Sequence, residues 1–248
     1  MNITKYILIL FFFNAYCQVS NETIIDDDGN KYKTTIIGGQ EWLKENLNVS
    51  KYSDGTIIPQ VTDLKKWLRM ETGAWCYYEN KSSNGIKFGK LYNWYAVAGI
   101  YDKSSLLDPK LRKKLAPEGW RIPNNDDLIN LISSLDSTFQ DAEMHECKTS
   151  SIAIGKMIDM NSTNLIYKDN ILNNESGFSA IFAGKLNEIE FVYEGKITGW
   201  WTFNQSEADI NKKNKSILGM NYGEREKFVG ICFGENPING YSVRCIKN

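Results

Sequence analysis

The chain of 248 residues carries 29 Lys and Arg against 30 Asp and Glu, a formal net charge of −1 at neutral pH. It contains no block of basic residues to neutralise a phosphate backbone, so we expect no nucleic-acid partner. Aromatic residues make up 12% of the chain and include seven tryptophans. This length and composition are sufficient for a substantial hydrophobic core.

The N-terminus has the layout of a secretory signal. Lys5 precedes an apolar run over residues 6–13, and Ala15 and Cys17 place small residues at the −3 and −1 positions of a cleavage site before Gln18. The apolar run is shorter than the ~20 residues that cross a bilayer. The pattern therefore predicts cleavage and export.

We expect a signal peptide over residues 1–17 and a single mature domain over residues 18–248, secreted or held at the cell surface. No transmembrane segment is expected after signal removal. A second interpretation makes Cys17 the lipid-bearing first residue of a lipoprotein. Tyr16 is bulky for the position before such a cysteine, which favours the first interpretation.

Turn residues and apolar patterns predict short elements along the first half of the chain. A turn at residues 26–30 leads into a hairpin over residues 31–43. Asp63 is predicted to cap a short helix at residues 64–68. Residues 73–78 then have the composition of a strand, residues 88–97 that of a short helix packed inward, and residues 100–115 that of a charged loop with a weak helical pattern.

The strongest helical signal follows Pro123. Asn124 or Asn125 is predicted to cap this helix, and Asp126 and Asp127 in its first turn complement the helix dipole. The apolar residues fall on one face at helical spacing: Leu128, Leu131, Ile132 and Leu135.

The rest of the chain is predicted to be a loop-rich region followed by a sheet. Residues 136–175 are polar and rich in Asn, and residues 175–180 return to the core. No internal repeat or linker divides the chain, so one α+β domain is the simplest interpretation. The expected strands are residues 191–193, 199–202, 216–222, 227–233 and 241–246.

Four cysteines lie beyond the expected signal, and an oxidising compartment favours one or two disulfides. The four allow three pairings. Cys232 and Cys245 flank an expected hairpin, so this pair is our first prediction. No two cysteines have the C-x-x-C spacing of a zinc or redox site, and we predict no metal site and no cofactor. The four are Cys76, Cys147, Cys232 and Cys245.

Two signatures resemble the core of C-type lectins: a Gly-Trp-Arg-x-Pro turn at residues 119–123 and a closing Gly-Tyr-x-Val-Arg-Cys strand from residue 240. More broadly, the chain resembles the Fibrobacter succinogenes major paralogous domain, a module of exported bacterial proteins. The matching segments are residues 28–34, 40–47, 52–55, 89–97, 117–123, 174–180, 199–202 and 240–246.

The resemblance implies a C-type-lectin-like core of short antiparallel strands, one or two helices and long loops, also shared by formylglycine-generating enzymes. It implies no particular activity. The family usually carries a cysteine just before the Pro-x-Gly-Trp segment, where this chain has Ala116. If that cysteine pairs with the one in Val-Arg-Cys, then Cys245 has another partner here, Cys232 or Cys147, or stays reduced.

Three motifs are interpreted as structural. His145, the only histidine, lies in a polar segment and is expected in an exposed loop, without the orienting group that Cys-His or Ser-His-Asp catalysis requires. The acidic residues 26–28 lack the spaced ligands of a calcium loop and predict a turn. Residues 235–237 invert the last two residues of the Glu-Pro-Asn lectin motif and also predict a turn.

Trp200 and Trp201 are the best candidates for a binding contact. Neighbouring strand residues face opposite sides, so one ring is expected to point away from the core. We expect a non-catalytic module for extracellular or cell-surface interaction, with carbohydrate or an envelope protein as ligand. The alternatives are a structural envelope component and an enzyme related to formylglycine-generating oxidases, whose paired-cysteine metal site has no evident counterpart here.

Overall fold

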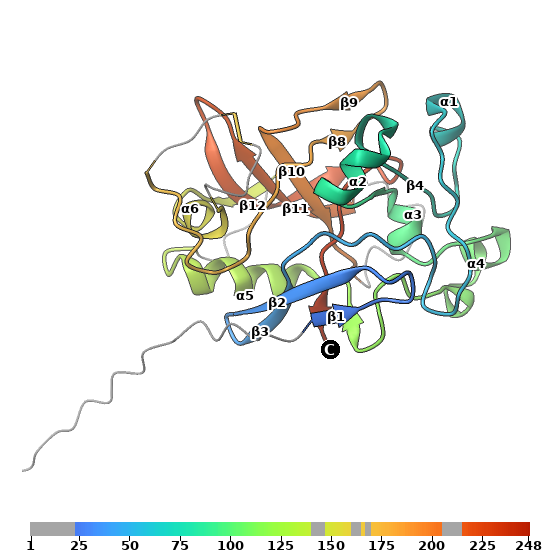
Figure 1. The fold of residues 1–248 in the computed structure, drawn as a ribbon, viewed down its shortest axis with the longest axis horizontal. Coiled ribbons are helices and arrows are strands. Elements are labelled where there is room, and N and C mark those ends of the chain that lie inside the picture. Colours follow the sequence, from blue (N-terminus) through green and yellow to red (C-terminus); the bar gives the residue numbers. More distant parts are fainter. Residues whose placement is uncertain (1–22, 140–146, 160–164, 167–169, 205–214) are drawn as a thin grey trace, which may run out of the picture.

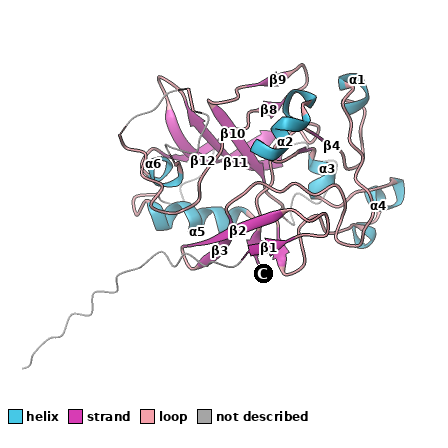
Figure 2. Ribbon diagram, in the orientation of Figure 1, coloured by secondary structure: helices cyan, strands magenta, loops and turns pink. Residues whose placement is uncertain are grey.

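The computed structural model describes residues 23–139, 147–159, 165–166, 170–204 and 215–248. Within these residues the fold is α+β, with two main antiparallel sheets, two small strand pairs and six short α-helices (Figure 1, Figure 2). None of the helices in this part of the chain is long and apolar enough to span a bilayer.

The first sheet joins the N-terminal hairpin to the end of the chain. Its strand order is β1-β2-β3-β13-β6, so the last strand lies between the hairpin and the strand that precedes the longest helix. The hairpin and the turn at residues 26–30 form as predicted. The strands are β1 (Thr23–Ile25), β2 (Lys31–Ile37), β3 (Gln40–Leu43), β6 (Trp120–Arg121) and β13 (Ile246–Lys247).

The second sheet has the order β10-β11-β12-β7 and is covered by helices on one face. Apolar side chains of α5 and α6, among them Leu131 and Ile154, pack with Leu218 and Ile231 of the sheet in one buried cluster (Figure 1). Its strands are β7 (Cys147–Ser150), β10 (Ile197–Trp201), β11 (Lys215–Tyr222) and β12 (Lys227–Glu235).

The predicted helix after Pro123 is confirmed as α5 (Asn125–Leu135). Asn124 caps it: its side-chain oxygen accepts a hydrogen bond from the Asp127 backbone at 3.0 Å, and the Asp127 carboxylate accepts one from the Asn124 backbone at 2.8 Å. This reciprocal pair satisfies two backbone donors that a helix start leaves without intrahelical partners.

The structure contains more helices than the one or two expected, because most span a single turn and show no helical periodicity in sequence. β7 and α6 also lie in the region expected to be mainly loop; their pairing and packing depend on β12. The short helices are α1 (Leu64–Trp67), α2 (Ser82–Phe88), α3 (Trp94–Val97), α4 (Lys103–Leu107) and α6 (Ala153–Met157), with 3₁₀ turns at Tyr78–Asn80 and Pro109–Leu111. The small strand pairs are β4 (Trp75–Cys76) with β5 (Leu91–Tyr92) and β8 (Lys185–Leu186) with β9 (Phe191–Val192).

The last residues connect the two sheets. The Trp201 backbone donates to the Ser242 carbonyl at 3.0 Å, and the Leu43 backbone donates to the Cys245 carbonyl at 3.0 Å. Figure 1 shows this red segment descending from the second sheet to the first. Of the closing strand predicted over residues 241–246, only its last residue belongs to a regular strand, β13.

Candidate functional site

Trp200 and Trp201, the predicted binding residues, are both buried, with 1% and 0% of their surface exposed. They face opposite sides of β10, as strand geometry requires, but the expectation that one ring points away from the core is wrong because both sides are covered. On one side Trp200 Nε1 donates to Asn46 Oδ1 at 2.7 Å. On the other, Trp201 Nε1 donates to the Tyr92 carbonyl at 2.7 Å, and the ring packs edge-on against Tyr241.

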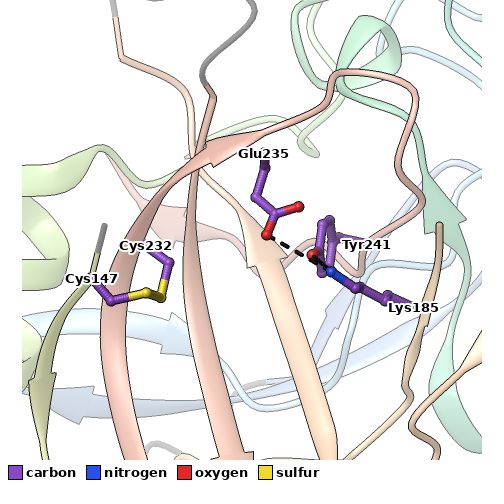
Figure 3. The surroundings of a disulfide bond; sticks show 5 residues. All are labelled: Cys147, Lys185, Cys232, Glu235 and Tyr241. Atoms are coloured by element: carbon purple, nitrogen blue, oxygen red, sulfur yellow. Dashed lines mark hydrogen bonds and ion pairs between the residues drawn. A yellow bond between two sulfur atoms is a disulfide. The ribbon is translucent and has the colours of Figure 1, made fainter. Parts of the chain in front are cut away.

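Cys232 forms its disulfide with Cys147, and the predicted bond to Cys245 is wrong (Figure 3). Cys232 and Cys147 lie directly opposite each other on β12 and β7. Cys245 cannot bond to Cys232, because the segment that carries Cys245 lies beside β3 of the first sheet. It is a buried free thiol, like Cys76, and burial raises the pKa of both above its usual value.

In the acidic turn at residues 26–30, the carboxylates of Asp26 and Asp28 accept hydrogen bonds from other groups of the protein. Asp26 accepts hydrogen bonds from the Asn30 side chain and the Tyr32 hydroxyl, and Asp28 accepts from the backbone and hydroxyl of Ser50. These donors stabilise a turn, as predicted. His145 lies outside the described residues.

Residues 235–237 begin a tight turn, as predicted. The Asn239 backbone donates to the Asn236 carbonyl at 2.9 Å, and the Pro237 carbonyl accepts from the Trp94 backbone at 2.9 Å. In the part of the chain that the structure describes, no three His, Cys, Asp or Glu residues are grouped so that they could hold a metal ion. Glu235 faces instead into a groove on the second sheet.

This groove lies on the face of the second sheet that carries Trp201. Three glycines lie in register across neighbouring strands there: Gly199 of β10 is opposite Gly219 of β11, which is opposite Gly230 of β12. Glycine in a strand interior is typical of places where a ligand or another backbone approaches closely. The residues two positions along, on the same face, are much larger: Trp201, Ile217 and Cys232.

At two of the three glycines, other parts of the protein occupy the space that a side chain would need. A Cβ at Gly199 would lie 2.7 Å from the Tyr241 ring, and a Cβ at Gly230 would collide with the Lys148 carbonyl. At Gly219 the nearest atom would be the Cys232 sulfur at 3.3 Å. Of the three glycines in the row, Gly219 is the one that lines the cavity on this face, and we call this cavity the Gly219 groove.

The Gly219 groove has a volume of about 440 Å³. Figure 3 shows the disulfide on one side and the side chains of Lys185, Tyr241 and Glu235 on the other. Toward the far end of β11 it is bordered by a second row of residues in register across the strands: Ile197, Asn221 and Phe228.

A polar cluster closes one end of the groove. Lys185 Nζ donates to Tyr241 Oη at 2.8 Å and lies 3.9 Å from Glu235 Oε1. Burial, and then the neighbouring Glu235, raise the pKa of Tyr241, so its phenol stays neutral. The Lys185 and Glu235 side chains retain 21% and 19% of their exposure. The groove therefore offers a cationic donor and a carboxylate acceptor whose charges balance.

A larger hollow of about 740 Å³ lies beside Trp120, Phe203 and the chain end. Two of its basic residues already have ion-pair partners. Arg121 pairs with the Asp127 carboxylate, and Lys113 pairs with Asp54. We take the Gly219 groove as the candidate because Lys185, Tyr241 and Glu235 form a connected polar cluster at its end.

Lys185, Gly219, Glu235 and Tyr241 were not among the residues that the sequence predicted for a site. One signal was present, since each of three consecutive predicted strands contains a glycine. The register that aligns these glycines is set by the sheet, so sequence alone cannot show that they form a row.

The family profile of the Fibrobacter succinogenes major domain matches residues 36–247. No curated protein and no solved structure was found to match the chain. The matched range contains the whole second sheet, the end of β2 with β3, β6 and β13 of the first sheet, and the whole Gly219 groove. The chain belongs to the Fibrobacter succinogenes major domain family.

Proposed function

We propose that this protein is an exported, non-catalytic interaction module that binds a carbohydrate or protein ligand in the Gly219 groove, outside the cell or at its surface. One observation carries the proposal: Gly219 lines a groove on the second sheet, while Lys185 and Glu235 remain partly exposed at its end. Its volume of about 440 Å³ falls within the range of small-molecule sites.

Export is supported by the signal pattern over residues 1–17 and by the Cys147–Cys232 disulfide, a bond that oxidising compartments favour. We further propose a C-type-lectin-like core. The arrangement that supports it is the chain end lying beside β3 and β6, with α5 following the Gly-Trp-Arg-x-Pro turn.

A non-catalytic role is supported by the state of the cysteines. Cys76 and Cys245 are buried with raised pKa values, so neither presents the accessible thiolate of a reactive cysteine. Cys232, which a paired-cysteine metal site would need in reduced form beside Cys245, is bonded to Cys147. A purely structural envelope component would not need a groove that is lined by Gly219 and has two partly exposed charged side chains at its end.

The test uses the chain from residue 18 and its Gly219→Val variant, which fills the groove. Both are applied to a glycan array and to a pull-down from the native envelope, after circular dichroism and thermal unfolding show that they are folded. We expect a ligand that the wild type binds and the variant does not. A folded wild type that binds nothing in either assay would overturn the proposal, as would equal binding by the variant.

A further inference from the structure

We infer that the occupant of the Gly219 groove is a neutral pyranose ring, held with a C–H face on Gly219 and its hydroxyls at the polar end. This inference rests on the proposed function and narrows the ligand of the same site. It follows from three properties of the groove: its floor, the groups at its end, and its length.

The floor offers no backbone partner to a peptide. β11 is hydrogen-bonded to β10 on one side and to β12 on the other throughout the groove, from Ile217 to Asn221. Peptides that add a strand need an unpaired sheet edge, and this floor is the interior of a sheet. At Gly219 it is a flat surface without a side chain, which suits the C–H face of a ring.

The polar end requires a ligand group that both donates and accepts. Lys185 donates, the Glu235 side chain offers acceptor oxygens, and Tyr241 joins them through its hydroxyl. Neighbouring sugar hydroxyls meet both needs, one accepting from Lys185 and the next donating to Glu235. The two charges balance each other, so the groove has no net charge with which to select an acidic or basic ligand.

The dimensions fit one ring. From Ile217 to Asn221 the floor extends four residues along β11, about 13 Å at ~3.3 Å per residue. The Cys147–Cys232 disulfide lies beside the Ile217 end, and half-buried Phe228 lies opposite Asn221. These borders leave space for a single pyranose with its substituents, and the Asn221 amide is placed to contact a further hydroxyl.

The experiment measures binding of the methyl glycosides of glucose, galactose and mannose to the chain from residue 18, by saturation-transfer NMR and titration. Methyl glucuronide serves as the acidic probe, and an uncharged Gly-Ser tripeptide as the peptide probe. The variants are Gly219→Val, which fills the floor, and Lys185→Gln, which replaces the charged donor with a neutral amide. Lys31→Gln, an exposed lysine of the first sheet, is the matched control.

We expect at least one neutral glycoside to bind, with an affinity loss of about tenfold or more in Gly219→Val and about tenfold in Lys185→Gln, the equivalent of one charge-assisted hydrogen bond. Lys31→Gln should bind as the wild type does. Lys185→Gln provides an independent test of the same groove should Gly219→Val fail to fold.

Tighter binding of the glucuronide or the tripeptide than of every neutral glycoside would overturn the inference and leave the proposed function standing. The same holds if only an envelope protein binds and Gly219→Val abolishes that binding. Glycoside binding that both variants retain would place the sugar elsewhere and overturn the groove as the site. If no probe and no envelope component binds the folded wild type, the proposed function fails as well.

Discussion

The guanidinium carbon of Arg244 lies 4.1 Å from the centre of the Phe178 ring. Arg244 is 1% exposed; it donates to the Phe178 carbonyl and, at 3.0 Å, to Asn46 Oδ1, and it stacks on Trp200. Among the described residues no carboxylate forms an ion pair with it. Burial lowers the pKa of Arg244 to about 9, so it remains charged at neutral pH. This buried cation joins the chain end to two distant segments.

We expect Arg244→Ala to lower the free energy of unfolding by about 3–5 kcal/mol, because it leaves a large cavity between two aromatic rings. Arg244→Met keeps most of the volume and removes a buried charge, so its cost should be smaller, about 1–2 kcal/mol for the two hydrogen bonds lost. Urea unfolding of both variants measures the difference. Equal costs would show that the hydrogen bonds, and not the packing, hold the tail.

The three glycines of the row should differ in how well they tolerate an added side chain. Gly199→Ala places a Cβ against the Tyr241 ring, and Gly230→Ala places one against the Lys148 carbonyl, so each should lower stability by about 1–3 kcal/mol. Gly219→Ala places a Cβ 3.3 Å from the Cys232 sulfur and 3.6 Å from Ile217 Cδ1. These contacts need only a small shift of side chains, so the change should alter stability by about 0.5 kcal/mol or less.

Thermal and urea unfolding of these three alanine variants give the comparison directly. A large loss in Gly219→Ala would mean that the floor of the groove is packed by neighbouring atoms, and the groove would no longer be a candidate site.

Protonation of the Asp127 carboxylate is expected to lower the stability of the fold in acid. Burial by itself raises the pKa of Asp127, but hydrogen bonds from Arg121, Asn124 and Gln40 bring it below its usual value. A carboxyl whose folded pKa is depressed contributes stability above its unfolded pKa, about 3.9, and this is lost as pH falls through the folded pKa. We expect Asp127→Asn to lower stability at pH 7 by about 1–2 kcal/mol and to flatten its decline below pH 4.

Melting temperature measured from pH 2 to pH 7 tests this expectation. Asp126→Asn is the matched control, because Asp126 is an exposed carboxylate in the same first turn of α5. A pH profile of Asp127→Asn that parallels that of the wild type would show that other carboxylates dominate the acid transition.

Ala116 stands where the family usually has a cysteine, and this substitution leads to a prediction. Ala116 and Cys245 are both buried in the same core cluster, and Cys245 is a free thiol. We expect Ala116→Cys to form a disulfide with Cys245 under oxidising conditions and to raise the free energy of unfolding by about 2–4 kcal/mol. Two free thiols should be labelled in the denatured, unreduced wild-type chain from residue 18, and one in the variant.

Labelling of three thiols in that variant would show that the two positions do not meet. Labelling of the native wild type should be slow, because Cys76 and Cys245 are both buried. This comparison also tests the Cys147–Cys232 pairing, since any other pairing that involves Cys245 would protect it in the denatured chain.

The sequence was sufficient where the signal is local. The α5 helix followed from the apolar face at Leu128, Leu131 and Ile132 and from the cap at Asn124, because neighbours along the chain supply both. The hairpin of β2 and β3 and the cap at Asp63 were predicted on the same basis. The short helices α2 and α6 were missed, since so few residues show no helical period.

Tertiary structure decided two kinds of feature: which residues of neighbouring strands lie opposite each other, and whether both faces of a strand are buried. Sequence predicted correctly that Trp200 and Trp201 face opposite ways, because alternation is a property of the strand itself, but burial of both rings requires two other layers of the molecule. Likewise, Cys232 meets Cys147, and Gly219 lines a groove, only because separate strands align side by side. Such alignment is fixed by packing between segments distant in the chain, and no local pattern of residues encodes it.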